Sequence, residues 1–465
     1  MPEMSTSTTT TTTTNAAPAT PATGDASSAH ASRSAELYAR ALRVLPGGVS
    51  RNTVLRDPHP AYLDRASGCR ITDLDGVERI DFANNMCSLI HGHADPGIVA
   101  AVTAQLARGT ASTLATEVEV DFAEHVVGRS PSFEKVRFVN SGTEALMVCL
   151  KAARAFTGRP RIAKVEGAYH GAYDAAEVSQ APGPDTWGDA DHPRSVPLVH
   201  GTPQSTLDDV VVLPFDDPER AVAILDEHRG DLACVLLDLM PHRVGLRPAS
   251  PAFVDAIRDW TERHGALLVL DEVITFRTEV GGLQARYDAR PDLTAMGKMI
   301  GGGFPVGAVA GRADVMDTMN PRGEGPLRFP HSGTFSANPI SMVAGLEAMR
   351  RFDAAAVARL NELGERARRG IEAAIGRTGS AACVTGTGSM FRVHMKADPP
   401  RNYREAWATP AEKTRLARLL DHLFHAGFVM INTCSGVLST PMGEAEIDAL
   451  VAAMEDGLAA DAAGG

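Results

Sequence analysis

The chain has 465 residues, of which 44% are hydrophobic and 22% charged, a composition typical of a globular protein with a large buried core. Its formal net charge of −12 provides no broad basic field, so we expect neither a nucleic acid nor a membrane surface as a partner. The six cysteines are scattered without a Cys-x-x-Cys motif, which favours buried thiols in a reducing cytoplasm, and no apolar run approaches the roughly 20 residues of a membrane span.

The N-terminal part begins with a low-complexity segment, residues 1–32, rich in Thr, Ala, Pro and Ser. It buries little apolar surface and lacks the apolar segment of a secretory signal, so we predict a disordered tail. A helix is predicted over Ala35 to Val44, before Pro46-Gly47-Gly48. Arg70 to Asp81 predicts a β-hairpin that turns at Asp75-Gly76.

From Pro96 onward the pattern alternates between helices and short apolar strands, which predicts the mostly parallel sheet of an α/β domain. The expected strands are Val136 to Val139, Arg161 to Val165, Val210 to Leu213, Ala233 to Asp238 and Ala266 to Leu270. The last ~115 residues predict a smaller α+β domain with which the hairpin packs. Its helices are expected over Asn361 to Gly376, Ala411 to Ala426 and Ala445 to Leu458, and its strands over Ser389 to Met395 and Phe428 to Ile431.

An acid and a lysine stand out in the middle of the chain. Asp271 follows the apolar run Ala266 to Leu270, at the strand edge where open α/β sheets bind ligands. Lys298 lies in an apolar, glycine-flanked segment, where desolvation would lower its pKa and free the amine as a nucleophile. Such a pair suits pyridoxal phosphate (PLP), because the lysine forms an imine with the cofactor and the acid keeps the ring nitrogen protonated. For the pair alone, a solvated acid and a surface lysine are the alternative.

Two loops add an anion site and an aromatic side chain. Ser141-Gly142-Thr143 joins a strand to a helix, so a hydroxyl, free N–H groups and the positive dipole end converge there. Plain helix capping by Ser141 or Thr143 is the alternative, and it uses the same groups. Tyr169 lies on a glycine-flanked loop and would suit stacking on a flat ring, or closing the domain edge. Ala181 to Thr206 is typical of a functional lid.

Two other motifs do not predict a site. His91 and His93 lack helical ligand spacing and a supporting Cys or acid cluster, so no metal is expected. Gly301-Gly302-Gly303 lacks the Gly-x-Gly-x-x-Gly pattern of a dinucleotide enzyme.

Together, these segments resemble the class III aminotransferases of PLP fold type I, and in particular glutamate-1-semialdehyde 2,1-aminomutase and the β-amino-acid (β-phenylalanine-type) aminotransferases. The resemblance extends from about Leu45 to Met454. Its motifs are Pro46 to Val49, Val136 to Ala145, Gly167 to Gly171, Leu270 to Val273, Gly297 to Gly303 and His331 to Pro339.

The resemblance implies an α/β fold. A large domain would hold a mostly parallel, seven-stranded sheet flanked by helices, and the N-terminal segment and the C-terminus would form a smaller α+β domain. The expected parts are the tail 1–32, an N-terminal segment 33–95 that packs with the small domain, the PLP-binding domain 96–345 and the small domain 346–465.

The resemblance also implies roles for residues around the cofactor. Lys298 would form the aldimine and then carry the proton between substrate Cα and cofactor C4′, while Asp271 would pair with the pyridine nitrogen. Ser141, Gly142 and Thr143 would hold the phosphate.

Four further residues receive roles in the same way. Tyr169 would stack on one face of the ring, and Val273 would press on the other. Thr334 would reach the phosphate of the neighbouring subunit, which implies a homodimer with shared active sites. Arg51 would hold the substrate carboxylate bidentately; a surface arginine on a loop is the alternative.

Departures from the family pattern lie where a substrate would touch. The family's Glu-Pro is Asp238-Leu239 here, its Gly-Asn pair is His242-Arg243, and Asn432 to Gly436 replaces its C-terminal polar contacts. Arg243 and Arg277 are further candidates for binding a carboxylate.

The expected activity is that of a cytoplasmic PLP-dependent aminotransferase. It would move an amino group between an amino acid, β-amino acids included, or a related amine and a keto or aldehyde acceptor. The alternative is an intramolecular 2,1-aminomutase. A non-catalytic protein of this fold is disfavoured because Lys298 and Asp271 are both present.

Overall fold

The computed structural model describes residues 32–288 and 290–463, so the predicted tail lies almost wholly outside the described residues. The chain divides into two compact units, Met1–Ala61 and Tyr62–Gly465. In the first unit, α1 (Arg33–Ala41) begins after Ser32, whose hydroxyl accepts a hydrogen bond from the Ala35 N–H at 3.2 Å. Two 3₁₀ turns, η1 (Pro46–Gly48) and η2 (Asn52–Val54), follow.

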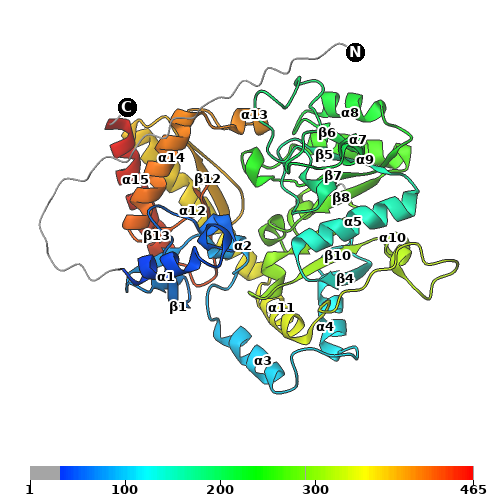
Figure 1. The fold of residues 1–465 in the computed structure, drawn as a ribbon, viewed down its shortest axis with the longest axis horizontal. Helices are drawn as coiled ribbons and strands as arrows, with labels where there is room; N and C mark the ends of the chain where they lie inside the picture. The colour runs from blue at the N-terminus through cyan, green and yellow to red at the C-terminus, as the bar shows by residue number, and fades with distance from the viewer. Residues whose placement is uncertain (1–31, 289, 464–465) are drawn as a thin grey trace, which may run out of the picture. The chain divides into compact units, whose positions relative to one another are not determined.

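The centre of the second unit is a seven-stranded sheet in the order β4-β10-β9-β8-β7-β5-β6 (Figure 1). Its strands are β4 (Lys135–Val139), β5 (Arg161–Val165), β6 (Val210–Leu213), β7 (Leu232–Leu237), β8 (Leu267–Asp271), β9 (Leu293–Gly297) and β10 (Gly307–Gly311). Only β10 runs antiparallel to its neighbours, β4 and β9. The predicted mostly parallel sheet is therefore confirmed, and the carboxyl ends of the six parallel strands share one edge.

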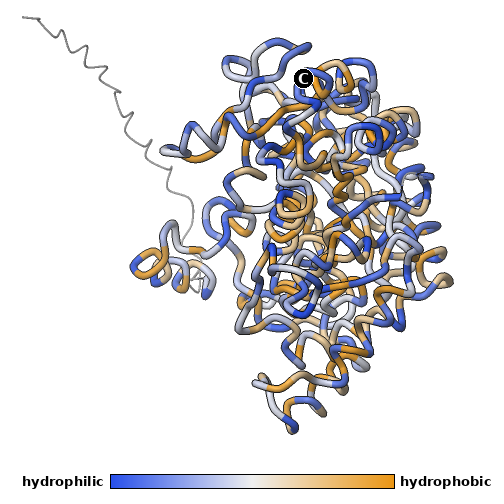
Figure 2. The backbone as a smooth tube through the Cα atoms, turned by 90° about the vertical axis from the view of Figure 1, so that its right-hand side faces the viewer, coloured by the Kyte–Doolittle hydropathy of each residue, from blue (hydrophilic) through white to orange (hydrophobic). Residues whose placement is uncertain are grey.

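Both faces of this sheet are covered, which explains the continuous apolar runs of β6 and β7. In β7, Leu236 packs in the cluster formed with α5, whereas Val235 and Leu237 pack in the cluster formed with α8 and α9. Hydrophobic stretches of the tube accordingly gather in the interior, and hydrophilic ones at the outer turns (Figure 2).

The helices of the second unit are α2 (Asn84–Cys87), α3 (Pro96–Leu106), α4 (Glu117–Val127), α5 (Gly142–Thr157), α6 (Asp174–Glu177), α7 (Gln204–Asp208), α8 (Pro218–Asp226), α9 (Pro251–His264), α10 (Ala313–Met316), α11 (Pro339–Arg351), α12 (Ala354–Thr378), α13 (Tyr403–Ala406), α14 (Pro410–His425) and α15 (Glu444–Ala463).

Two smaller sheets lie beside α12, α14 and α15 (Figure 1). The first, β1-β2-β3-β13, consists of β1 (Leu63–Ser67), β2 (Arg70–Asp73), β3 (Glu78–Asp81) and β13 (Phe428–Val429). Strand β13 pairs in parallel with β3, so the predicted hairpin and its packing against the C-terminal part are confirmed. The second sheet contains β11 (Cys383–Thr385), β12 (Met390–His394) and β14 (Ser435–Val437). The predicted boundary at residues 345–346 falls inside α11, and the division into large and small domains stays a prediction.

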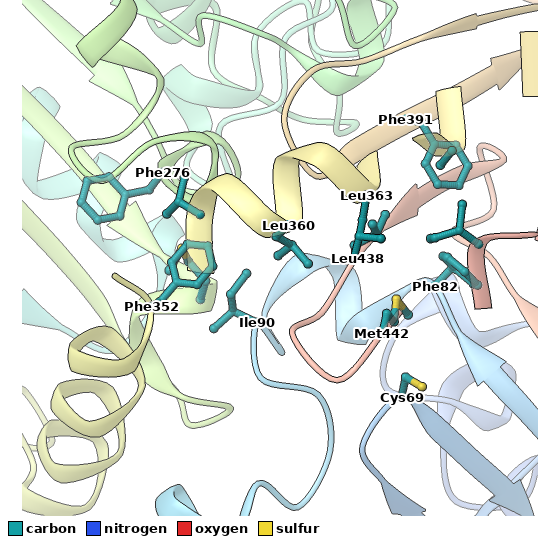
Figure 3. Packing of buried hydrophobic residues seen from close by; sticks show 14 of the residues in the cluster. Cys69, Phe82, Ile90, Phe276, Phe352, Leu360, Leu363, Phe391, Leu438 and Met442 are labelled. Carbon is teal, nitrogen blue, oxygen red and sulfur yellow. The ribbon is translucent and has the colours of Figure 1, made fainter. Parts of the chain in front are cut away.

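One apolar cluster runs along α12 and joins these sheets to the central one. Figure 3 shows Leu360 and Leu363 of α12 between Phe276 and Phe352 on one side and Phe391 on the other. All of these side chains are buried. Because this core is continuous, the parts of the second unit that carry the catalytic candidates pack directly against the C-terminal segment.

Candidate active site

The predicted site residues of the second unit gather at the carboxyl edge of the central sheet. Strand β8 ends at Asp271, and β9 is followed directly by Lys298. The helix that begins with Gly142 follows β4, and the Tyr169 loop follows β5. These residues come together because parallel strands bring their carboxyl ends to the same edge.

Asp271 is a buried carboxylate with an oriented pair of oxygens. Its Oδ1 accepts a hydrogen bond from the Val273 N–H at 3.0 Å, and its Oδ2 lies 2.8 Å from Nδ1 of His170. Burial lowers the pKa of His170, so the neutral ring donates its Nδ1–H to Asp271. His170 is fully buried and was not assigned a role from the sequence; its position beside Tyr169 gives no sign of its partner.

Two more acids, Asp238 and Glu272, lie near Asp271, and burial raises the pKa of each. Burial, followed by the negative charge of Asp271, raises the pKa of Asp238 well above its ordinary range, which favours the neutral carboxyl. Burial raises the pKa of Glu272 to about 7. Glu272 accepts hydrogen bonds from the N–H groups of Leu283 and Gln284 at 3.0 and 2.7 Å, which makes it a support for that loop.

Lys298 follows β9 with a left-handed backbone, φ +50°, which is uncommon for a residue with a side chain. It is half-buried. Burial lowers the pKa of His242, and the positive charge of Lys298 acts in the same direction. The same charge opposes the rise that burial causes in the pKa of Asp238. The glycines around it permit close packing. A Cβ on Gly297 would lie 3.3 Å from the Gly142 Cα, and one on Gly302 would lie 2.4 Å from the Ala344 carbonyl oxygen.

The N-terminus of α5 lies beside this lysine. Ser141 caps the helix, and its hydroxyl accepts a hydrogen bond from the Glu144 N–H at 3.1 Å. The N–H groups of Gly142 and Thr143 belong to the first turn, where helical amides have no intrahelical partner. A Cβ on Gly142 would lie 2.8 Å from Val273 Cγ1, so the Val273 side chain packs against the helix start. The structure confirms capping by Ser141, and anion binding at this helix start stays a prediction that uses the same segment.

Tyr169 is exposed, but the loop that carries it is firmly held. Its ring centroid lies 6.0 Å from that of His242, and the Arg243 guanidinium carbon lies 5.8 Å from the Tyr169 ring. Just before it, the fully buried Lys164 amine donates to the carbonyl oxygens of Ala168 and Val178 at 3.1 and 2.7 Å. Burial lowers the pKa of Lys164 to about 7. The sequence did not predict this support, because a lysine within a strand pattern is equally typical of an exposed edge strand.

The remaining predicted residues are exposed. Thr334 lies in a segment close to the start of α5, because a Cβ on Gly333 would lie 3.5 Å from Glu144 Oε1. Arg51 precedes η2 in the first unit. Arg277, by contrast, is fully buried and donates from Nε to the Ser389 hydroxyl at 2.9 Å and from Nη2 to the Leu438 carbonyl. It holds the C-terminal segment in place.

The histidine pair is used structurally. His91 bonds to the Thr440 hydroxyl and the Ala348 carbonyl, and His93 Nε2 lies 2.8 Å from Asp81 Oδ2. Within residues 32–288 and 290–463, there is no cluster of three or more metal-ligating side chains. In the same part of the chain, no helix has the length and apolar character needed to cross a membrane. All six cysteines are buried free thiols, as predicted.

Comparisons with known proteins extend over most of the chain. The family model for aminotransferase class-III matches residues 53–453. The glutamate-1-semialdehyde 2,1-aminomutase of Methanothermobacter thermautotrophicus is 38% identical over 375 residues, covering 80% of this chain and 86% of that protein. An omega-transaminase from Sphaerobacter thermophilus is 48% identical, with a TM-score of 0.89 and coverage of 94% and 99%. A β-phenylalanine aminotransferase from Variovorax paradoxus is 33% identical, with a TM-score of 0.80 and coverage of 91% and 93%.

Proposed function

Because the chain belongs to the class III aminotransferase family, we propose that it is an aminotransferase that uses pyridoxal 5′-phosphate. Enzymes of this family bind that cofactor. The reaction would move an amino group from an amino acid, β-amino acids included, or a related amine to a keto or aldehyde acceptor. The similarity to an omega-transaminase and to a β-phenylalanine aminotransferase supports this choice.

The observation that carries the proposal is the placement of Asp271 at the end of β8 and of Lys298 directly after the neighbouring strand β9. Asp271 is buried, and its two oxygens are oriented by Val273 N–H and His170. When bound, pyridoxal phosphate supplies an electron-accepting ring whose nitrogen must stay protonated. Asp271 would hold that proton, because a buried anion close to a cationic N–H favours its charged form.

The other residues fit the remaining parts of the cofactor. The start of α5 offers the amides of Gly142 and Thr143, together with the Ser141 hydroxyl, to a phosphate. Tyr169 and Val273 would contact the two faces of the ring. The Lys298 amine would bind the cofactor aldehyde and then move the proton from substrate Cα to C4′.

A second candidate reaction is the intramolecular 2,1-aminomutase. The 38% identity to a glutamate-1-semialdehyde aminomutase favours it. Both reactions would use the same residues and differ in whether the keto intermediate leaves the site. An aminomutase would convert its substrate to an isomer without free keto product.

A donor screen on the purified holoenzyme tests the proposal. The cofactor is followed by its absorption while α- and β-amino acids are added one at a time, and free keto product is assayed. We expect conversion to the amine form with release of a keto product. Lys298→Ala serves as the control: it should lose the absorption of the lysine-bound cofactor and nearly all turnover. If no donor converts the cofactor, or if borohydride reduction attaches it to another residue, the proposal is wrong.

We also propose that the protein is a cytoplasmic homodimer in which Thr334 of each chain reaches the phosphate held by the other. The six buried free thiols support the location. The exposure of Thr334 supports a contact made by a second copy, because the described part of its own chain leaves it uncovered.

A further inference from the structure

Helix α13 connects the C-terminal part of the second unit with the loop that carries Tyr169. It belongs to the segment between β12 and α14, and in Figure 1 it lies between α14 and β5. Glu166 follows β5 directly and binds Arg404 with both carboxylate oxygens: Oε2 accepts from Nε at 2.9 Å, and Oε1 accepts from Nη2 at 3.0 Å. Glu166 is buried, so this ion pair firmly joins two segments that are 238 positions apart in the sequence.

The same guanidinium also binds the backbone of the segment that the sequence predicts as a lid. Arg404 donates to the carbonyl oxygens of Trp187, Gly188 and Asp189 at 3.1, 2.9 and 3.0 Å. Its guanidinium carbon lies 5.1 Å from the centroid of the Trp187 ring, which in turn packs edge-on against Tyr403. Because every nitrogen of the guanidinium makes a hydrogen bond, the planar group is fixed in one orientation. This part of the predicted lid is therefore fastened to α13.

Tyr403 holds the Tyr169 loop at its first glycine. Gly167 has φ +75°, and a Cβ there would lie 1.9 Å from Cδ2 of Tyr403, so the tyrosine ring lies directly on the Gly167 backbone. The Tyr403 hydroxyl donates to the Pro182 carbonyl oxygen at 3.0 Å. Burial raises the pKa of Tyr403 to about 12, so the hydroxyl keeps the proton that it donates. Tyr403 thus has a fixed position of its own from which it supports the loop.

Thr143 holds the same loop at its second glycine. A Cβ on Gly171 would lie 2.4 Å from Thr143 Oγ1, and this oxygen accepts a hydrogen bond from the Ala172 N–H at 3.4 Å. Tyr169 therefore lies between two glycines, each packed against a side chain from another element: Tyr403 from α13 and Thr143 from the start of α5. The Tyr169 side chain itself is exposed, so the position of its ring depends largely on how the loop is held.

We propose that Tyr403 and Arg404 are positioning residues that act through the loop on Tyr169 and hold its ring against the cofactor. This inference rests on the proposed function, which places Tyr169 on one face of the cofactor ring. The contribution of an aromatic contact depends on the distance and angle between the rings. A displacement of the loop by about 1 Å would therefore weaken the contact, although neither Tyr403 nor Arg404 would itself leave the core.

A double-mutant cycle on the holoenzyme tests the inference. Tyr403→Leu, Tyr169→Leu and the combination of both are compared with the wild type. The bound cofactor is displaced by excess 4-deoxypyridoxine 5′-phosphate, and its release is followed by the loss of the visible circular dichroism of the lysine-bound form. Arg401→Gln is the matched control, because Arg401 is exposed and pairs with Glu405 beside the same helix.

We expect Tyr169→Leu to release the cofactor roughly three- to tenfold faster than the wild type, the range for the loss of one aromatic contact. Tyr403→Leu should have a similar effect when Tyr169 is present. In the Tyr169→Leu background it should leave the rate nearly unchanged, because both substitutions remove the same contact. Tyr403→Phe keeps the ring on Gly167 and should release the cofactor as the wild type does, and so should Arg401→Gln.

Thermal unfolding separates positioning from a merely structural role. Tyr403→Leu removes a buried ring, so it should lower the melting temperature in both backgrounds. If it also accelerates cofactor release equally in both backgrounds, the inference is overturned. Should Tyr403→Leu fail to fold, Arg404→Lys carries the same cycle, since it keeps the charge beside Glu166 but loses the bidentate contact.

The cycle does not require turnover, so its outcome is independent of the donor screen. Coupling between Tyr403 and Tyr169 in an enzyme whose cofactor no donor converts would reject the proposed reaction and leave the positioning role in place. Conversion by a donor without such coupling would reject the positioning role alone.

Discussion

Nδ1 of His170 lies 2.8 Å from Oδ2 of Asp271, although the two residues are 101 positions apart in the sequence. Both side chains are buried, and the neutral histidine donates the bond. The histidine therefore orients the carboxylate that would hold the proton on the cofactor nitrogen, and it limits the positions that Asp271 can adopt.

Replacing His170 by Ala should weaken this orientation. We expect proton removal from the donor to slow by about tenfold, because loss of a bond to a buried charged group costs about 1–3 kcal/mol. His170→Asn should recover most of the rate, since the Asn amide can donate in place of Nδ1. Single-turnover absorption measurements at saturating donor check this. Equal rates in the Ala variant and the wild type would show that Asp271 needs no partner.

Lys164→Met should change how stability depends on pH. The folded-state pKa of Lys164 is lowered to about 7 from 10.5, so the unfolded chain binds more protons than the folded chain between these values. Stability contributed through this group therefore rises as pH increases from about 7 toward 10, by up to about 1.4 kcal/mol per pH unit. In Lys164→Met this rise should be missing.

Denaturant unfolding of the wild type and Lys164→Met at several pH values between 7 and 10 checks the prediction. The variant also leaves the carbonyl oxygens of Ala168 and Val178 without their donor, so it should be less stable than the wild type toward pH 10, where the proton-linked cost of Lys164 has disappeared. Parallel stability curves across this pH range would contradict the assignment of the titration to Lys164.

Gly302→Ala should be strongly destabilising. Gly302 has φ +58°, and an added Cβ would lie 2.4 Å from the Ala344 carbonyl oxygen. We expect a loss of about 2–4 kcal/mol, from left-handed strain plus overpacking. Gly379→Ala is the matched control: its φ is +68° and nothing lies within 4 Å of the added Cβ, so it should lose only about 1–2 kcal/mol. Thermal unfolding measures the loss of stability in both variants. Similar losses would show that the close approach to the Ala344 carbonyl oxygen adds no steric cost.

A mixed dimer tests the shared site. A Lys298→Ala chain paired with a Thr334→Ala chain contains one site with both residues intact, if Thr334 serves the neighbouring subunit. We therefore expect the purified mixed dimer to recover up to about half of wild-type activity, whereas each parent dimer is impaired. Differently tagged chains allow the mixed species to be isolated. No recovery above the Thr334→Ala parent would place Thr334 in its own chain's site.

Comparison of the predicted with the observed strands shows which sequence patterns are sufficient to predict a strand. The predicted strands Arg161 to Val165 and Val210 to Leu213 coincide with β5 and β6, and β6 is a continuous apolar run between turns. Strands β9 and β10 were not predicted, although Lys298 follows β9. Their sequences, LTAMG and GAVAG, are rich in alanine and glycine, which have low strand propensity, and packing within the sheet overrides that preference.

By itself, the sequence determined the mostly parallel sheet, the family and the candidate residues Asp271 and Lys298, because apolar periodicity and motif spacing are local properties of the chain. Only the tertiary structure decided which side chains meet: His170 with Asp271, Lys164 with the loop before Tyr169, and Arg392 with the segment that carries Arg243. These partners come from different strands and loops. Their pairing depends on burial and on the removal of water, which no local pattern records.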